Sequence, residues 1–148
     1  MGVSNRPPWS RMSRRTARKN AFLNLYQSDV NDSPLESTIR RWQEYRGELE
    51  PYALRLARGV VVEQEGLDAT LAEVSEGWPV HRMSAIDRTI LRLALYEMLY
   101  VEDVPPDVAV NEAIELARGF SGEDAPAFVG GVLRGAGLRV HREVGHGR

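Results

Sequence analysis

The segment from Ser84 to Leu99 constrains the fold most, because its apolar side chains cover nearly every side of a helix. Ser84 and Asp87 have the spacing of a capping box at its start. One stripe along the helix carries Ile86, Ile90, Leu93 and Ala94. The other faces carry Leu91, Leu95, Met98 and Leu99. A helix that is apolar all round is enclosed by its neighbours. The segment therefore predicts a central helix within a helical bundle.

Five other segments carry apolar residues at helical spacing, with recognisable starts or ends. Ser13 is predicted to cap the first helix. Ser33 is predicted to cap the second, with Pro34 at its first position and Glu36 closing a capping box. Gly119 suits the C-terminal cap of the fifth helix. The predicted helices cover about residues 14–28, 34–46, 50–78, 85–102, 107–118 and 125–140.

These patterns predict an all-α fold, a compact bundle of six to seven helices around the central apolar helix. No segment has the pattern of a strand, and no repeat of fixed period occurs. The helical domain is expected over residues 13–140. Residues 1–12 are expected to form a flexible basic arm and residues 141–148 a short tail.

Basic residues are concentrated at the beginning of the chain. The first twenty residues hold six of them and no acid, which leaves 13 basic against 21 acidic residues in the remainder. The overall net charge of −2 hides this asymmetry. Such an asymmetry predicts an anionic partner at the N-terminus, with nucleic acid as the first candidate. A solvated tail without a specific role is the alternative.

Four of these cations, Arg14, Arg15, Arg18 and Lys19, lie in the first two turns of the predicted first helix. They are expected largely off its apolar face, which carries Ala17, Ala21, Phe22 and Leu25. Exposed cations near a helix N-terminus oppose the helix dipole by about 0.3–1 kcal/mol each. A bound phosphate would reverse this cost, because it interacts favourably with both the dipole and the arginines. The placement therefore favours nucleic-acid binding over a solvated tail.

Composition and spacing exclude several kinds of site. The chain has no cysteine, so disulfides, thiol nucleophiles and zinc–thiolate sites are excluded. The three histidines are too scattered for a metal site, and no spacing suggests a catalytic triad. Gly130 and Gly131 lie within a helical pattern that no strand precedes, which indicates close packing or a frayed helix rather than a phosphate loop. We expect no metal and no cofactor.

The chain is also expected to be cytoplasmic and without a membrane partner. No apolar run approaches the roughly 18 residues that a membrane span needs. The N-terminus lacks the apolar segment of a signal peptide.

Glu97 is the most unusual acid, because it lies on the apolar stripe of the predicted central helix. A buried carboxylate must be paired, hydrogen-bonded or neutral. We expect Glu97 to accept hydrogen bonds from the backbone, a tyrosine or an arginine, with general acid–base chemistry as the alternative.

Three further residues have two interpretations each. Asp87 is a helix cap or a contact for a basic partner, Tyr26 is core edge or interface anchor, and Phe128 is core or a base-stacking ring.

Four strings of this sequence resemble the NusB family of bacterial transcription antitermination factors. They are RRTARKNAFLNLY at residues 14–26, MSAIDRTILRLALYE at 83–97, DVPPDVAVNEAIELAR at 103–118 and FVGGVL at 128–133. The resemblance spans about residues 13–138. The combination of ILRLALYE with VxxNEAIELA is specific, whereas the N-terminal string alone would be a weak match.

This resemblance implies an all-α fold of two helical sub-bundles and a non-catalytic function. The implied partners are boxA-type single-stranded RNA from ribosomal operon leaders and NusE, a ribosomal protein of the small subunit. Both belong to the transcription complex with RNA polymerase. The family includes monomers and homodimers, so both states remain open for this chain.

The resemblance also implies roles for individual residues. Arg14, Arg15 and Arg18 match positions that would bind RNA phosphates. Asp124 and Phe128 would lie near the RNA surface, and Tyr26 and Asp87 would face NusE.

This sequence departs from the family pattern at two positions. Lys19 stands where the family often has glutamate, which adds a cation to the basic patch. Gly130 stands where asparagine usually precedes glycine, so it has no side chain to form that residue's hydrogen bonds.

Two other functions compete with RNA-dependent antitermination. One is a helical protein-interaction module whose basic end contacts an acidic protein without specific RNA recognition. The other is an enzyme, because a similar helical domain occurs fused to RNA cytosine methyltransferases. The sequence has no nucleotide-binding α/β region and no cysteine nucleophile, which argues against the enzyme.

Overall fold

The computed structural model describes the backbone of residues 10–146 and the side chains of residues 14–139. This part of the chain contains six α-helices, one 3-10 helix and no strand, which confirms the predicted all-α fold. The α-helices are α1 (Ser10–Val30), α2 (Leu35–Arg46), α3 (Pro51–Val74), α4 (Ala85–Tyr100), α5 (Pro106–Phe120) and α6 (Ala125–His146), and the 3-10 helix η1 covers Val80–Arg82.

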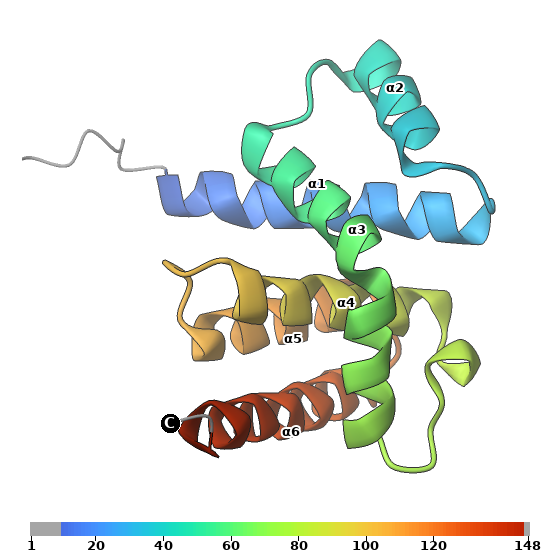
Figure 1. The fold of residues 1–148 in the computed structure, drawn as a ribbon. Coiled ribbons are helices and arrows are strands. Elements are labelled where there is room, and N and C mark those ends of the chain that lie inside the picture. The colour runs from blue at the N-terminus through green and yellow to red at the C-terminus, as the bar shows by residue number, and fades with distance from the viewer. Residues whose placement is uncertain (1–9, 147–148) are drawn as a thin grey trace, which may run out of the picture.

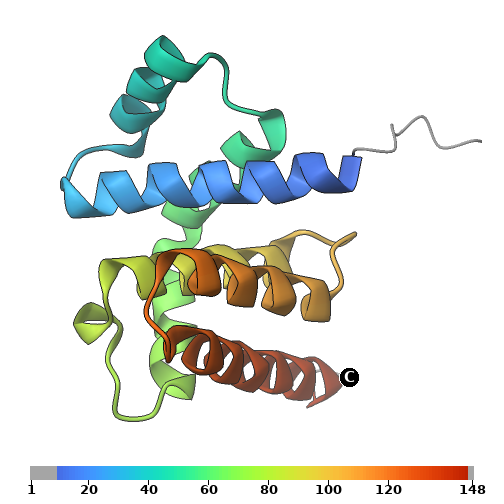
Figure 2. The ribbon, with the colours of Figure 1, turned by 180° about the vertical axis from the view of Figure 1, so that it is seen from behind.

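The helices form two groups that share the long helix α3 (Figure 1). Helices α1 and α2 pack with each other and with α3, while α4, α5 and α6 pack against one another. Both α1 and α3 also contact α4, which joins the two groups. From the opposite side, α1, α5 and α6 lie one below the other (Figure 2). The two helical sub-bundles implied by the sequence resemblance are therefore present.

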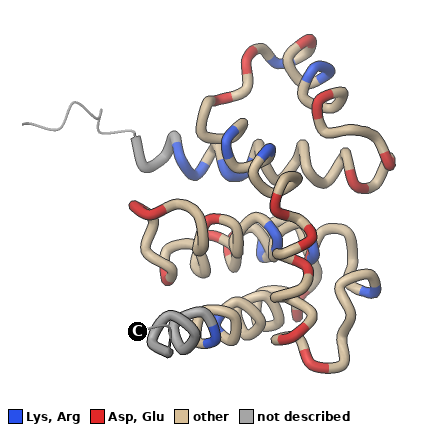
Figure 3. The backbone as a smooth tube through the Cα atoms, in the orientation of Figure 1, with Lys and Arg blue, Asp and Glu red and all other residues tan. Residues whose placement is uncertain are grey.

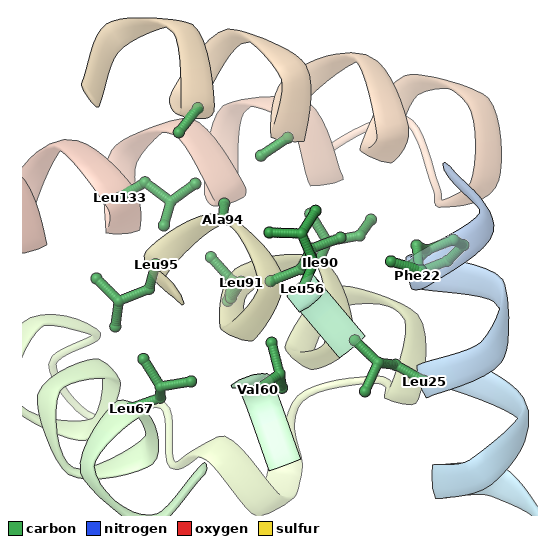
Figure 4. Close-up of a cluster of buried hydrophobic side chains, with 14 of the residues drawn as sticks. Phe22, Leu25, Leu56, Val60, Leu67, Ile90, Leu91, Ala94, Leu95 and Leu133 are labelled. Carbon is green, nitrogen blue, oxygen red and sulfur yellow. The ribbon is translucent and has the colours of Figure 1, made fainter. Parts of the chain in front are cut away.

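Helix α4 is the centre of the molecule, as its sequence predicts. It contacts α1, α3, α5 and α6, and its Ile90, Leu91 and Leu95 are fully buried. Figure 4 shows these side chains gathered with Leu67 of α3 and Leu133 of α6. Burying a side chain of this size stabilises the fold by about 1.5–3 kcal/mol. A helix without a solvated face must therefore form together with its neighbours.

One of the two predicted capping boxes forms in part. Ser84 caps α4, because its Oγ accepts a hydrogen bond from the backbone N–H of Asp87 at 3.0 Å. The cap predicted at Ser33 is wrong. Pro34 is extended, with ψ of 141°, and is itself the N-cap of α2, so that helix begins at Leu35. The Ser33 Oγ is buried and has no hydrogen-bond partner among the described residues.

The ends of α1 and α6 also differ from the sequence prediction. Helix α1 begins at Ser10, so Ser13 lies inside it rather than capping it. Residues 10–12 of the predicted arm are therefore helical, and residues 1–9 lie outside the described residues. Helix α6 continues to His146, into the segment predicted as a tail.

Two inner boundaries shift for local reasons. Helix α3 ends at Val74 instead of continuing to Trp78, because the Oγ of Ser75 donates a hydrogen bond to the Trp78 carbonyl at 2.8 Å and closes a turn. Helix α5 does not end before Gly119 but continues through it to Phe120.

Gly59 allows α3 to approach α4 closely. A Cβ atom at this position would lie 2.1 Å from the Cζ of Tyr96 in α4. Nonbonded carbons do not approach so closely, so any side chain here would displace the tyrosine ring. Gly66 lies further along α3, and a Cβ atom placed on it would have no other atom within 4 Å.

These two glycines provide a matched test of the packing. We expect Gly59→Ala to destabilise the protein by about 1–2 kcal/mol, because overpacking outweighs the gain in helix propensity. Gly66→Ala should stabilise it by about 0.5–1 kcal/mol, since the gain there meets no contact. Urea unfolding measures both changes. Equal effects of the two substitutions would show that the close approach of Tyr96 is not a constraint.

Candidate functional site

The four predicted cations lie on the first half of α1, but they do not share one face of it. Arg15 and Lys19 are exposed, Arg14 is half-buried, and Arg18 is buried with 7% of its surface exposed. At about 100° per residue, Arg14 and Arg18 fall on the same inward row as Phe22. The expectation that the cations lie largely off the apolar face is therefore wrong for Arg14 and Arg18.

Arg18 belongs to a buried polar cluster that joins three helices. Its Nε lies 2.7 and 3.0 Å from the two carboxylate oxygens of Glu97 in α4. The hydroxyl of Tyr52 in α3 donates to the same carboxylate. Glu97 is 1% exposed, so its charge depends on these partners. The expected structural role of Glu97 is confirmed, whereas the enclosed position of Arg18 does not suit the RNA contact predicted for it.

Tyr52 keeps its proton because of this cluster. Burial raises the pKa of Tyr52 above its ordinary value of 10.0, and the hydrogen bond to Glu97 raises it further. The phenol must donate to a carboxylate, which a phenolate cannot do. The guanidinium of Arg14 lies over the Tyr52 ring, 4.4 Å from its centroid. Two predicted phosphate ligands thus pack around one tyrosine.

Arg14 and Arg15 are also paired with carboxylates. Arg15 contacts Glu112 of α5 through two hydrogen bonds, from Nε at 3.1 Å and from Nη2 at 2.8 Å. This contact raises the pKa of Arg15. Arg14 lies 3.0 Å from Asp103 in the connection between α4 and α5. Figure 3 shows the basic start of α1 above the acidic positions of that connection.

A groove of about 320 Å³ lies between α1 and α5. Helices α1 and α5 run in the same direction (Figure 2). The residues that line the groove range from Arg15 and Glu112 to Phe120 at the end of α5. Lys19 lines it and, among the described side chains, forms no ion pair. We call this feature the α1–α5 groove, and its lining residues are Arg15, Thr16, Arg18, Lys19, Glu112, Glu115, Leu116 and Phe120.

Tyr26 and Asp87 lie at the end of the groove where α5 finishes. Tyr26 stacks on Phe22 with ring centroids 6.1 Å apart, and Phe22 packs on Phe120 at 5.0 Å. Asp87 accepts a hydrogen bond from the Ser121 Oγ at 2.7 Å, and Ser121 directly follows Phe120. These residues form one network of contacts, in which Phe22 is buried and the others are partly exposed. We call this network the aromatic–acid cluster. The structure therefore brings together the two residues predicted to face a protein partner.

Asp124 and Phe128 lie at the start of α6, in the segment that follows Ser121 of that cluster. Asp124 is exposed just before α6, and Phe128 is half-buried against the core. Asp124 is three residues after Ser121, which limits their separation to about 11 Å.

Gly130 follows on the inner side of α6. A Cβ there would lie 3.1 Å from the Cδ1 of Ile114. This contact confirms close packing as the meaning of that glycine.

Sequence reasoning missed the partners of the predicted residues, above all Glu112, Tyr52 and Phe120. A signal for Glu112 exists in the spacing of α5. Ala109, Leu116 and Phe120 form a second apolar row at i, i+7 and i+11, and Glu112 lies on that row at i+3. An acid on an apolar row facing a basic helix is a candidate ion-pair partner.

Two other kinds of feature are absent from the described residues. Within that range, no three histidine, aspartate or glutamate side chains are placed to hold a metal ion. None of the helices there combines the length and the apolar character that crossing a membrane requires.

Comparison with known proteins identifies the family. Residues 15–137 match the model of the NusB family. The transcription antitermination protein NusB of Rubrobacter xylanophilus is 71% identical over 136 residues, which cover 92% of this chain and 98% of the relative. The chain belongs to the NusB family, whose members are non-catalytic transcription antitermination proteins. This membership decides against the enzymatic alternative.

Solved structures agree with the observed fold. NusB of T. maritima superimposes with a TM-score of 0.75 at 34% identity, covering 83% of this chain and 89% of that one. A structure of the antitermination factors NusB and NusE in complex with double-stranded RNA gives a TM-score of 0.74 at 24% identity, covering 83% of this chain and 94% of that one. At that identity the second likeness shows the fold alone.

The buried cluster makes a prediction about alkaline stability. Tyr52→Phe should lower the free energy of unfolding by about 1.5–3 kcal/mol at neutral pH. The reason is that the charged Glu97 carboxylate loses the hydrogen bond that the Tyr52 hydroxyl donates to it. The pKa of Tyr52 is higher in the folded than in the unfolded chain, so this contribution is complete below about pH 10. It is lost as the pH rises above 10.

Urea unfolding of both proteins between pH 7 and pH 11 measures this difference. The gap between the wild type and Tyr52→Phe should narrow above pH 10. Tyr45→Phe, at an 82% exposed tyrosine on α2, is the control. It should change neither the free energy of unfolding at neutral pH nor its dependence on pH. A gap that stays constant across this range would contradict the raised pKa.

Proposed function

We propose that this protein binds boxA-type single-stranded RNA of ribosomal operons together with NusE, and acts in the transcription complex with RNA polymerase. The α1–α5 groove is the observation that carries this proposal. Arg15 and Lys19 at its edge offer cations to phosphates, while Phe120, 38% exposed, offers an aromatic surface for a base. A groove with both features suits an unpaired strand whose bases are accessible. A cytoplasmic location is part of the same proposal.

The protein partner is proposed to bind the aromatic–acid cluster. Tyr26 and Asp87 are half-buried there, and neither needs to leave its position to offer a ring edge and a carboxylate oxygen. Tyrosine is one of the residues enriched among interface anchors. Phe120 lies both in this cluster and in the groove, so RNA and NusE would occupy neighbouring surfaces.

A protein-interaction module without specific RNA recognition is the second candidate. The pairing of Arg14, Arg15 and Arg18 with carboxylates favours it, because paired arginines attract phosphate less than free ones. Titration of labelled boxA RNA and of a scrambled RNA separates the two candidates. Equal weak binding of both RNAs, unaffected by NusE, would support the second.

The phosphate contacts are tested by Arg14→Ala combined with Arg15→Ala. We expect weaker binding of boxA RNA and a flatter salt dependence, with the slope of log K against log salt reduced by about 0.7 for each lost phosphate contact. Fluorescence anisotropy at several salt concentrations measures both effects. Arg40→Ala with Arg41→Ala, two exposed neighbours on α2, is the matched control. An unchanged slope in the first variant would contradict the phosphate contacts.

The partner surface is tested by Tyr26→Ala and Asp87→Ala. We expect each to weaken NusE binding about tenfold or more, as truncation of an interface anchor does. RNA affinity in the absence of NusE should stay within about twofold of the wild type. Tyr45→Ala, at the exposed tyrosine of α2, provides the control, and circular dichroism checks the fold of each variant. Retained NusE affinity in both variants would place the partner elsewhere.

A further inference from the structure

Glu112 holds the same atoms of Arg15 that a phosphate would use. The Arg15 Nε and Nη2 contact one Glu112 oxygen each, at 3.1 and 2.8 Å. This two-pronged geometry of the guanidinium fits carboxylate and phosphate alike. A phosphate at Arg15 and the present contact with Glu112 therefore exclude each other.

The two members of this pair differ in their surroundings. The side chain of Arg15 is 69% exposed, whereas that of Glu112 is 15% exposed. Glu112 also lies 3.7 Å from the Nη1 of buried Arg18, which holds its carboxylate in place. Arg15 can consequently turn toward a ligand, while the Glu112 carboxylate stays beside the groove. Exposed ion pairs contribute only about 0–1 kcal/mol, so such an exchange is energetically accessible.

We propose that Glu112 limits RNA affinity by competing with phosphate for Arg15. This inference rests on the proposed RNA-binding function. Two costs act on an RNA strand in the α1–α5 groove: Arg15 must leave Glu112, and the released carboxylate then repels the phosphate. Glu115 lines the same groove with a side chain that is 53% exposed, and it adds to the repulsion. The attraction of RNA phosphates to the α1–α5 groove therefore contributes little to affinity, and contacts with the bases must supply the rest.

The test compares RNA binding by the wild type and Glu112→Gln. The amide keeps the shape of the side chain and removes its charge, so we expect boxA RNA to bind about three- to tenfold more tightly at low salt. Because salt screens the repulsion, the gain should shrink as salt rises. Scrambled RNA should gain by a similar factor, since its phosphates are the same. In the Arg15→Ala background the part of the gain that comes from competition for Arg15 should disappear, which leaves only the part that comes from relief of repulsion.

Glu36→Gln is the matched control. Glu36 contacts Arg58 through the same two-pronged geometry, at 2.8 and 2.9 Å, but this pair lies between α2 and α3. Its substitution should leave RNA binding unchanged. Glu115→Gln is a second test at an exposed position, where folding is not at risk, and should increase affinity by a smaller factor.

The outcomes separate this inference from the function on which it rests. Unchanged RNA binding by Glu112→Gln, with normal binding by the wild type, would overturn the competition alone. Weaker binding by Glu112→Gln would overturn it too, and would mean that Glu112 positions Arg15 for RNA. Failure of the wild type, Glu112→Gln and Glu115→Gln to bind boxA RNA would overturn the RNA-binding function as well.

Discussion

The buried contact between Arg18 and Glu97 determines where the amino-terminal helix lies. Glu97 belongs to the central helix α4, Arg18 to α1, and Tyr52 adds a hydrogen bond from α3. Removing either charge would leave the other without compensation in the core, which costs about 3–5 kcal/mol. Apolar packing of Ala17, Ala21 and neighbouring residues would tolerate small shifts of α1 along its axis, but a two-oxygen contact with a guanidinium does not. The same pair therefore fixes α1, and with it one wall of the α1–α5 groove.

The sequence predicts the helices well and the ion pairs poorly, for one physical reason. Apolar periodicity decides which face of a helix is buried, so α4 and its enclosed position could be predicted from Ser84–Leu99 alone. Glu97 stands out in the sequence because it interrupts that apolar pattern. Arg18 interrupts the pattern of α1 in the same way, but treating all cations of α1 as exposed conceals it. Two opposite charges on the apolar rows of different helices are a signal for a buried pair.

Other features of the site have no local signal. The contact of Arg15 with Glu112 joins residues 97 positions apart and requires α1 and α5 to lie parallel, which no spacing within either helix specifies. The second row of α5 indicates that Glu112 faces something, but not that it faces Arg15. The shift of α2 to begin at Leu35 depends on the conformation of Pro34 in the folded chain. Such details follow from tertiary packing, which overrides local capping preferences.

The arrangement of charge bears directly on the proposed RNA binding, because a chain of net charge −2 is not a general polycation. Asp103, Glu97 and Glu112 offset the described arginines of α1, so the basic end that dominates the sequence is much less basic in the folded protein. Nonspecific nucleic-acid binding comes mainly from phosphate attraction, and these carboxylates reduce that attraction. For the proposed RNA ligand, affinity would then depend on Lys19, on the exchange proposed at Arg15 and on contacts of bases with groove residues such as Phe120. On this proposal, sequence preference would follow from the balance, because only a strand that makes the base contacts would compensate for the carboxylates that its phosphates must approach.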